Sequence, residues 1–316
     1  MLKTTWKRIG LATGLSMSLV LAACGGGGAD EEGTDDSQQD TSQTEEAGED
    51  TAGSVGEAVD YTITGIDPGA GIMEAANQAL EDYELEGWEV QTSSDAAMTS
   101  ALESAIENEE PIIVTGWNPH WKFVVHDLKY LDDPKGTFGG EEDIYTFVRL
   151  GLEEDAPEAY QVLKNFHWES SDMETVMLEI SEGASPEEAA RNWVDENQDL
   201  VNEWTEGVEE VDGGDITIAM VAWDSTIAST NVVKTVLEDL GYNVQANSME
   251  APIMYGAVAE GEADALLAGW LPLTHEQYYN EYKDQMEQLG PSLEGAKIGL
   301  VVPEYMDIDS IEDLKE

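Results

Sequence analysis

Basic residues are scarce in this chain of 316 residues. Its 13 Lys and Arg residues face 68 Asp and Glu residues, which gives a formal net charge of −55. A field this negative repels nucleic acids and anionic lipid surfaces, so we expect neither as a partner. We interpret the acidic excess as a surface adapted to salt, in which carboxylates keep the protein hydrated. The length is sufficient for a sizeable core and about two domains.

Cysteine occurs once, at Cys24, which excludes a disulfide within the chain and a cysteine-based metal site. A basic start precedes it (Lys3, Lys7 and Arg8), followed by an apolar run at residues 9–21 that is too short for a comfortable membrane span. The sequence Leu-Ala-Ala-Cys closes this run and resembles a bacterial lipobox. That resemblance implies a signal peptide over residues 1–23 and lipid attached to Cys24. The alternatives are an ordinary signal peptide and a buried cysteine.

Apolar side chains are nearly missing from residue 25 to about residue 56, where Asp, Glu, Ser, Thr, Gln, Gly and Ala predominate. Such a segment cannot bury enough surface to offset the entropy lost on ordering. We therefore predict a disordered acidic tether over residues 24–59 and a folded part that begins near residue 60.

The folded part contains two stretches that end alike, in an apolar run followed by Gly-Trp-x-Pro at 116–119 and at 269–272. Each run is typical of a buried strand that stops at a turn. The segments before them also match, in the order strand, helix, strand, helix: residues 61–67, 72–83, 88–91 and 97–106 in one copy, and 216–224, 232–240, 242–245 and 252–259 in the other. A further matching pair of apolar segments follows, at 143–148 and 296–301.

These matches predict a βαβαβ unit that occurs twice, with right-handed crossovers. We expect an α/β protein with two similar lobes, lobe I at residues 60–145 plus 303–316 and lobe II at 146–302, joined by two crossover strands. Parallel sheets bind ligands beyond the carboxyl ends of their strands, so the cleft between the lobes is the expected site. The stretch between the copies is expected to be helical, with Trp193 and Trp204 on one buried stripe.

Three tryptophans stand at the ends of predicted strands: Trp117, Trp223 and Trp270. Three indoles in a cleft would offer electron-rich faces to a cation that cannot donate hydrogen bonds. Each face is worth ~0.5–1 kcal/mol when exposed and ~2 kcal/mol or more when desolvated. The alternative is three core tryptophans. The repeat favours the binding interpretation, because Trp117 and Trp270 occupy equivalent positions.

A carboxylate site is predicted where the first strand bends into a helix, at residues 67–72. The amides of Gly71 and Ile72 would remain unpaired at the positive end of that helix, which suits an anion. His275, five residues after Trp270, is a candidate donor from a ring nitrogen. The alternative for His275 is an ordinary surface histidine.

Enzymatic interpretations have weaker support in the sequence. Asp224, Ser225 and His275 supply an acid, a hydroxyl and an imidazole, but no Gly-x-Ser-x-Gly elbow is present. The histidines show no two-histidine metal spacing, since His120 and His126 are six residues apart. We therefore expect no metal, cofactor or catalytic group.

Taken together, these motifs resemble the glycine betaine/proline betaine-binding lipoproteins of osmoprotectant ABC importers. The matching strings lie at residues 65–73, 115–121, 128–135, 221–225, 227–231, 268–272, 274–275 and 310–315. The resemblance implies a periplasmic-binding-protein-like fold with the ligand in the cleft. In that family three tryptophans form a box for the quaternary ammonium, and they match Trp117, Trp223 and Trp270. Two backbone amides and a histidine hold the carboxylate, and they match Gly71, Ile72 and His275.

The resemblance implies a non-enzymatic receptor, lipid-anchored on the extracytoplasmic face of the cell membrane. It would deliver glycine betaine, with proline betaine as a further candidate, to a membrane permease driven by a cytoplasmic ATPase. The alternatives are a binder of choline, carnitine or another quaternary amine and, from a different class, an exported hydrolase using Ser225 and His275. The long acidic tether and the extreme charge depart from the family pattern and leave the affinity and its salt dependence open.

Overall fold

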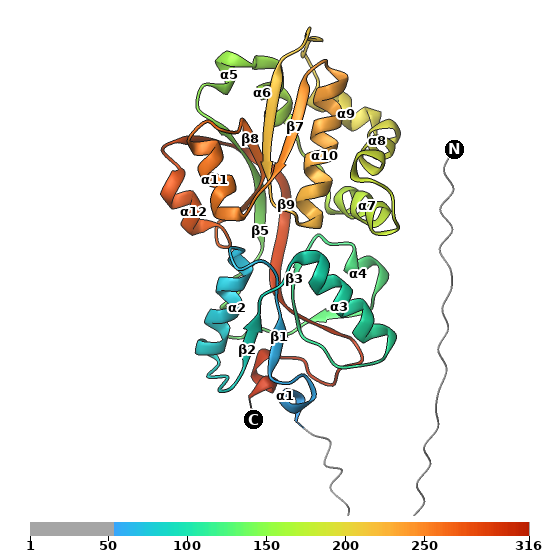
Figure 1. The fold of residues 1–316 in the computed structure, drawn as a ribbon, viewed down its shortest axis with the longest axis vertical. Helices are drawn as coiled ribbons and strands as arrows, with labels where there is room; N and C mark the ends of the chain where they lie inside the picture. Colours follow the sequence, from blue (N-terminus) through green and yellow to red (C-terminus); the bar gives the residue numbers. More distant parts are fainter. Residues whose placement is uncertain (1–53, 316) are drawn as a thin grey trace, which may run out of the picture. The chain divides into compact units, whose positions relative to one another are not determined.

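The computed structural model describes residues 54–315 (Figure 1). The predicted signal peptide, Cys24 and most of the predicted tether lie outside the described residues. The fold starts earlier than the expected residue 60, with α1 (Val55–Ala58). The Ser54 side chain accepts a hydrogen bond from the Glu57 amide at 3.2 Å, and Val55 and Val59 pack against the core. The end of the predicted tether therefore belongs to the folded part, because its two valines have apolar surface to bury.

The first βαβαβ unit is present as predicted. It consists of β1 (Thr62–Thr64), α2 (Gly71–Asp82), β2 (Glu89–Gln91), α3 (Asp95–Glu107) and β3 (Val114–Asn118). Strand β1 pairs in parallel with both β2 and β3. The short strand β4 (Leu128–Tyr130) and the short helix α4 (Lys122–Val125) follow.

The second unit repeats this arrangement. It consists of β6 (Asp215–Met220), α10 (Asp224–Asp239), β7 (Asn243–Ser248), α11 (Ala251–Ala259) and β8 (Ala265–Leu271). Here β6 pairs in parallel with both β7 and β8. The prediction of an α/β fold with two βαβαβ units is confirmed.

Two antiparallel strands join the units. Strand β5 (Glu142–Arg149) pairs with β8, and the 18-residue strand β9 (Met286–Pro303) pairs first with β5 and then with β3 and β4. The order in the sheet is β2-β1-β3-β9-β5-β8-β6-β7, and β9 runs from one unit into the other in Figure 1. We call residues 54–141 and 297–315 the first half, and residues 142–296 the second half.

This pairing differs in part from the expected lobe boundaries. Residues 297–302 were expected in lobe II, whereas in the structure they pair with β3 and β4 of the first half. The reason is the length of β9, which is sufficient for one strand to complete both units.

Helices fill the stretch between the units. These are α5 (Leu152–Asp155), α6 (Pro157–Asn165), α7 (Ser170–Ser181), α8 (Pro186–Glu196) and α9 (Gln198–Trp204). The helical stripe expected between the two units is divided at Asn197 into α8 and α9. Its two tryptophans, Trp193 and Trp204, are both buried in the core, as predicted. Trp193 and Trp204 stack with ring centroids 5.7 Å apart. Helices α7 and α8 pack against α10 (Figure 1).

Two short helical segments complete the fold, α12 (Glu276–Tyr282) and a 3₁₀ turn (Ile311–Leu314). Within residues 54–315, no helix has both the length and the apolar character needed to cross a membrane.

Gly269, the glycine of the second Gly-Trp-x-Pro motif, provides a test of how β8 packs against β5. A Cβ at Gly269 would lie 2.2 Å from Phe147 Cε2 and 3.0 Å from the Tyr145 carbonyl oxygen. Because overpacking a core costs about 1–3 kcal/mol, Gly269→Ala should lower the thermal midpoint by about 2–10 °C. Calorimetry of Gly140→Ala provides the control, because a Cβ there meets nothing within 4 Å. Equal midpoints for the two variants would contradict the described β8 packing.

Candidate functional site

A pocket between the two halves contains every residue predicted for ligand binding. The space among its lining atoms is about 290 Å³, open solvent included, so the pocket is small. From the first half it is lined by Ile66, Ala70, Gly71, Ile72, Trp117 and Ile298, and from the second half by Trp223, Trp270, Thr274 and His275. A pocket of this size and apolar lining suits a compact organic solute.

The three pocket tryptophans are held by the ends of the two units. Trp117 is the next-to-last residue of β3 and faces Ile298 of β9 in the antiparallel register. Trp270 is the next-to-last residue of β8 and faces Ile144 of β5. Trp223 immediately precedes α10. Their exposed fractions are 4, 4 and 6% in that order, so the rings are desolvated and present apolar surface to the pocket.

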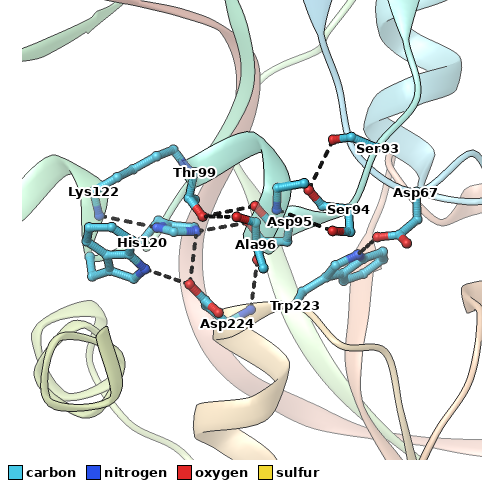
Figure 2. A network of polar contacts seen from close by, with 12 residues as sticks. Asp67, Ser93, Ser94, Asp95, Ala96, Thr99, His120, Lys122, Trp223 and Asp224 are labelled. Atoms are coloured by element: carbon cyan, nitrogen blue, oxygen red, sulfur yellow. Dashed lines mark hydrogen bonds and ion pairs between the residues drawn. The ribbon is translucent and has the colours of Figure 1, made fainter. Parts of the chain in front are cut away.

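Contacts around Trp223 fix the orientation of its ring. Its indole Nε1 donates a hydrogen bond to Asp67 Oδ2 at 3.3 Å, across the two halves (Figure 2). The ring stacks on the His275 imidazole with centroids 5.9 Å apart and an interplanar angle of 30°. The aromatic and the carboxylate-binding parts of the predicted site are therefore in direct contact.

The start of α2 also lines the pocket. Gly71 is the first helical residue, so its amide and that of Ile72 have no carbonyl partner in a preceding turn. The helix dipole adds partial positive charge at the same place. A Cβ at Gly71 would lie 2.0 Å from the Thr274 carbonyl oxygen. Glycine is thus required for the two halves to meet this closely at the amide end of the pocket.

His275 is fully buried and its two ring nitrogens differ in their surroundings. Nδ1 lies 3.0 Å from the Ala268 carbonyl oxygen, 3.2 Å from the Tyr255 hydroxyl and 3.3 Å from the Trp270 amide nitrogen. Nε2 is buried without a hydrogen-bond partner among the described residues. Burial lowers the pKa of His275 to about 4, so the ring is neutral at physiological pH. The Trp270 amide and the Tyr255 hydroxyl can donate to Nδ1, which suits a proton on Nε2, whereas the Ala268 carbonyl can accept only from a proton on Nδ1. An N–H donor at Nε2 requires the first of these tautomers.

The turn that carries His275 is fixed by a residue that the sequence did not single out. Glu142 is buried, and its Oε2 accepts hydrogen bonds from the amides of Leu273 at 2.9 Å and Thr274 at 2.8 Å. The Thr274 hydroxyl donates to the other carboxylate oxygen of Glu142. Nothing in the sequence distinguishes Glu142 from the other acidic residues, since its role depends on the pairing of β5 with β8.

The halves also contact each other on both sides of the pocket. Beside α2, the Tyr278 hydroxyl donates to the Gly69 carbonyl at 2.8 Å, and Gln277 donates to Glu74 at 2.8 Å. On the side of α3 and α10, the Asp224 amide donates to Asp95 Oδ2 at 2.9 Å. The pocket is therefore bounded by contacts that require both halves.

A second feature missed from the sequence is the buried charged network at this α3–α10 contact (Figure 2). It comprises Asp95, His120, Lys122 and Asp224, of which the first three are completely buried. The sequence holds one signal for it. His120 and Lys122 closely follow the first Gly-Trp-x-Pro motif, and Asp224 directly follows Trp223.

The burial of His275 leads to a spectroscopic prediction. Since its pKa is lowered to about 4, the ring should stay neutral between about pH 8 and pH 5, and its ¹⁵N shifts should place the proton on Nε2. Two-dimensional NMR of the histidine rings, with His275→Gln for assignment, provides the measurement. A His275 signal that titrates near pH 6.5 would contradict the buried, neutral ring.

A family model described as the substrate binding domain of ABC-type glycine betaine transport systems matches residues 37–196 and 214–316. The glycine betaine/carnitine transport binding protein GbuC of Listeria monocytogenes is 55% identical over 264 residues, which cover 83% of this chain and 88% of that protein.

Two solved structures are also similar. Lactococcal OpuAC, closed and complexed with glycine betaine, is 46% identical over 48% of this chain and 59% of its own, with a TM-score of 0.44. An ABC-transporter choline binding protein in complex with choline is 25% identical over 59% of this chain and 61% of its own, with a TM-score of 0.45. The alignments thus span about three fifths of the length of these two solved chains. On the strength of the family match and the 55% identical relative, this chain belongs to the family of substrate-binding domains of ABC-type glycine betaine transport systems.

Proposed function

We propose that this protein captures glycine betaine in the pocket between its two halves and delivers it to the permease of an ABC importer. The observation that supports this ligand is the composition of the pocket lining. Three indoles line it together with helix-start amides and a buried, neutral histidine. A small zwitterion with a quaternary ammonium and a carboxylate suits both kinds of group at once.

The ammonium end would lie among Trp117, Trp223 and Trp270. A trimethylammonium group has no N–H to donate, so it makes no N–H hydrogen bond to carbonyl or carboxylate oxygens, and ring faces attract its positive charge. These three side chains are almost completely buried, and a cation placed between them is therefore desolvated. Under those conditions each face contributes about 2 kcal/mol.

The carboxylate end would accept hydrogen bonds from the amides of Gly71 and Ile72 and from His275 Nε2. Each of these groups lines the pocket, and Nε2 has no other partner among the described residues. Hydrogen bonds to a charged group are worth about 1.5–3 kcal/mol each. The ring stacking of Trp223 on His275 keeps the two binding regions close enough for one small molecule.

We also propose that the two halves act as the two predicted lobes and close around the ligand. Contacts across the pocket, such as Tyr278 with Gly69, would form on closure. Ahead of the folded part, residues 1–23 would be removed, and lipid on Cys24 would anchor the protein outside the cytoplasmic membrane through the acidic tether. The hydrolase alternative with Ser225 and His275 is dropped, because the family consists of transport proteins.

A longer quaternary ammonium zwitterion, carnitine, is a second candidate ligand. A neighbouring cavity of about 270 Å³ shares Gly71, Thr274 and Ile298 with the pocket and is also lined by Glu74, Gln78 and Gln277. An extended, hydroxylated chain would find both space and polar partners there. The relative in Listeria monocytogenes is named for both glycine betaine and carnitine.

The tryptophan box can be tested by truncation. Each of Trp117→Ala, Trp223→Ala and Trp270→Ala removes one desolvated ring face and should cost roughly 1–2 kcal/mol, or about five- to thirtyfold in affinity for glycine betaine. Isothermal titration provides the measurement. Trp88→Ala, which removes a buried ring just before β2 and outside the pocket lining, is the control and should retain the wild-type affinity. If all three pocket variants bind like wild type, the box does not exist.

The carboxylate site should separate glycine betaine from choline. Choline has the same ammonium group but a hydroxyl in place of the carboxylate, and so leaves donors unpaired in a closed pocket. Losing about two charged hydrogen bonds should weaken choline by roughly 3–6 kcal/mol, on the order of a hundred- to ten-thousandfold. His275→Ala should narrow this gap by weakening betaine far more than choline.

Competition titration of choline, carnitine and glycine betaine against wild type and His275→Ala measures this gap. Equal affinities of the wild type for choline and betaine would refute the carboxylate site while leaving the tryptophan box intact.

A further inference from the structure

The buried charged network at the α3–α10 contact joins the two halves directly. Asp95 at the start of α3 and His120 after β3 belong to the first half, and Asp224 at the start of α10 belongs to the second (Figure 2). His120 Nε2 lies 3.5 Å from Asp95 Oδ1 and 3.9 Å from Asp224 Oδ2. One ligand atom from each of the three residues lies within 4.8 Å of the others. Two carboxylates from opposite halves therefore face each other around one imidazole.

Hydrogen bonds across the halves accompany this contact. The Trp121 indole Nε1 donates to Asp224 Oδ2 at 2.6 Å, and the Asp224 amide donates to Asp95 Oδ2 at 2.9 Å. Since these partners belong to different halves, both bonds depend on the halves being together.

The same network also contacts two of the tryptophans of the proposed ligand site. Asp224 directly follows Trp223 in the chain, so the bonds that hold Asp224 also restrain that ring. On the other half, Lys122 Nζ lies 4.3 Å from the ring centroid of Trp117, and the His120 ring meets the same indole edge-on at 5.0 Å. Two of the three pocket tryptophans are thus positioned by the network.

The protonation of His120 can be read from its neighbours. The Lys122 amide donates to His120 Nδ1 at 3.2 Å, which leaves the ring proton on Nε2, facing Asp95 and Asp224. Burial lowers the pKa of His120 well below its ordinary value, so the ring is neutral. The network therefore contains two carboxylates, one neutral imidazole and the Lys122 ammonium, and its carboxylates repel each other when both are ionised.

The spacing of Asp95, His120 and Asp224 also resembles a three-ligand metal site. Two observations argue against that use. The imidazole nitrogen that faces the carboxylates carries the proton, so it has no lone pair for a metal. Lys122, which interacts electrostatically with all three residues, would repel a divalent cation. A proton is the simpler way to relieve the carboxylate repulsion.

We propose that Trp121 and Asp224 are positioning residues of the binding site, and that Asp95 and Asp224 share one bound proton when the two halves close on the ligand. This inference rests on the proposed function, because closure is followed through glycine betaine binding. The protein would then take up a proton as it binds its ligand.

The direction of the pH dependence follows from where each group lies. Burial, and then the neighbouring Asp95, raise the pKa of Asp224 in the closed form. With the halves apart, Asp224 loses this neighbour and its pKa falls back, so lower pH favours the closed form. Burial raises the pKa of Asp95 to about 6 and lowers that of Lys122 to about 7. Raising the pH therefore ionises both carboxylates and discharges Lys122, and both changes oppose closure.

The groups that surround Asp224 are Asp95, His120, Trp121 and Lys122. The His126 ring packs against Trp121, with ring centroids 6.2 Å apart. The carboxylate of the ligand stays ionised above about pH 5, and its quaternary ammonium does not titrate. A pH-dependent affinity must therefore come from the protein, and His126→Gln identifies any share due to that ring.

The first experiment removes the cross-half hydrogen bond. Trp121→Phe retains most of the ring but loses the N–H donor to Asp224, and the dissociation constant for glycine betaine should rise about tenfold, mainly through faster release. Trp204→Phe is the matched control, because its indole donates to the His167 carbonyl at 2.9 Å within the second half. The control should bind like wild type. Trp121→Phe with unchanged affinity would overturn the positioning role.

The second experiment measures glycine betaine affinity against pH at constant salt. Wild type should bind about three- to tenfold more tightly at about pH 5.5 than at about pH 7.5, and Asp224→Asn should abolish this difference. Asp264→Asn is the matched control, since Asp264 bonds Arg149 at 2.7 Å and the Thr217 amide at 2.8 Å within the second half. It should retain the wild-type pH profile. A flat wild-type profile, or an Asp224→Asn profile as steep as wild type, would refute the shared proton.

A third measurement separates this inference from the proposed function. The indole N–H resonance of Trp121 reports its bond to Asp224 in the closed form, so with saturating glycine betaine it should shift with pH in wild type but not in Asp224→Asn. If wild type failed to bind glycine betaine, the proposed function would be wrong. If wild type bound the ligand but the indole resonance ignored both pH and Asp224→Asn, only the proton-sharing contact would be refuted.

Discussion

The antiparallel pairing of β9 with β3 at one end and with β5 at the other is the interaction on which the site depends. It sets Trp117 opposite Ile298, while the pairing of β5 with β8 sets Trp270 opposite Ile144. Two equivalent tryptophans are thereby presented to one pocket by strands of the same sheet. The third, Trp223, joins them because α10 begins directly after it.

Repetition made much of this arrangement predictable from the sequence. The Gly-Trp-x-Pro motifs, with matching strand and helix patterns before them, indicated two βαβαβ units and the places of Trp117 and Trp270. The Gly71 turn was found because a helix start leaves amides unpaired. The length of β9 was not foreseen, since Gly290, Pro291 and Gly295 within it are typical of turns rather than strands.

Glu142 and the Asp95–Asp224 contact were missed for a different reason. With 68 acidic residues in the chain, an individual carboxylate carries little information, and only the tertiary contacts show which few are buried. The two parts of the pocket also depend on different physics. Cation–π attraction needs dry ring faces, whereas the amide and imidazole donors need a partner that replaces water. Burial of the tryptophans and of His275 meets both needs.

The pairing of β9 with β3 and of β5 with β8 has a consequence for how the chain folds. The edge of β3 is covered by residues near the C-terminal end of the chain, and the edge of β8 by β5, which is made well before it. During synthesis the first unit is therefore complete in sequence long before its sheet is complete in space. Contacts of such high sequence separation slow folding, and an uncovered strand edge is a template for aggregation. Until β9 has been made, the edge of β3 therefore stays open to mispairing with another strand.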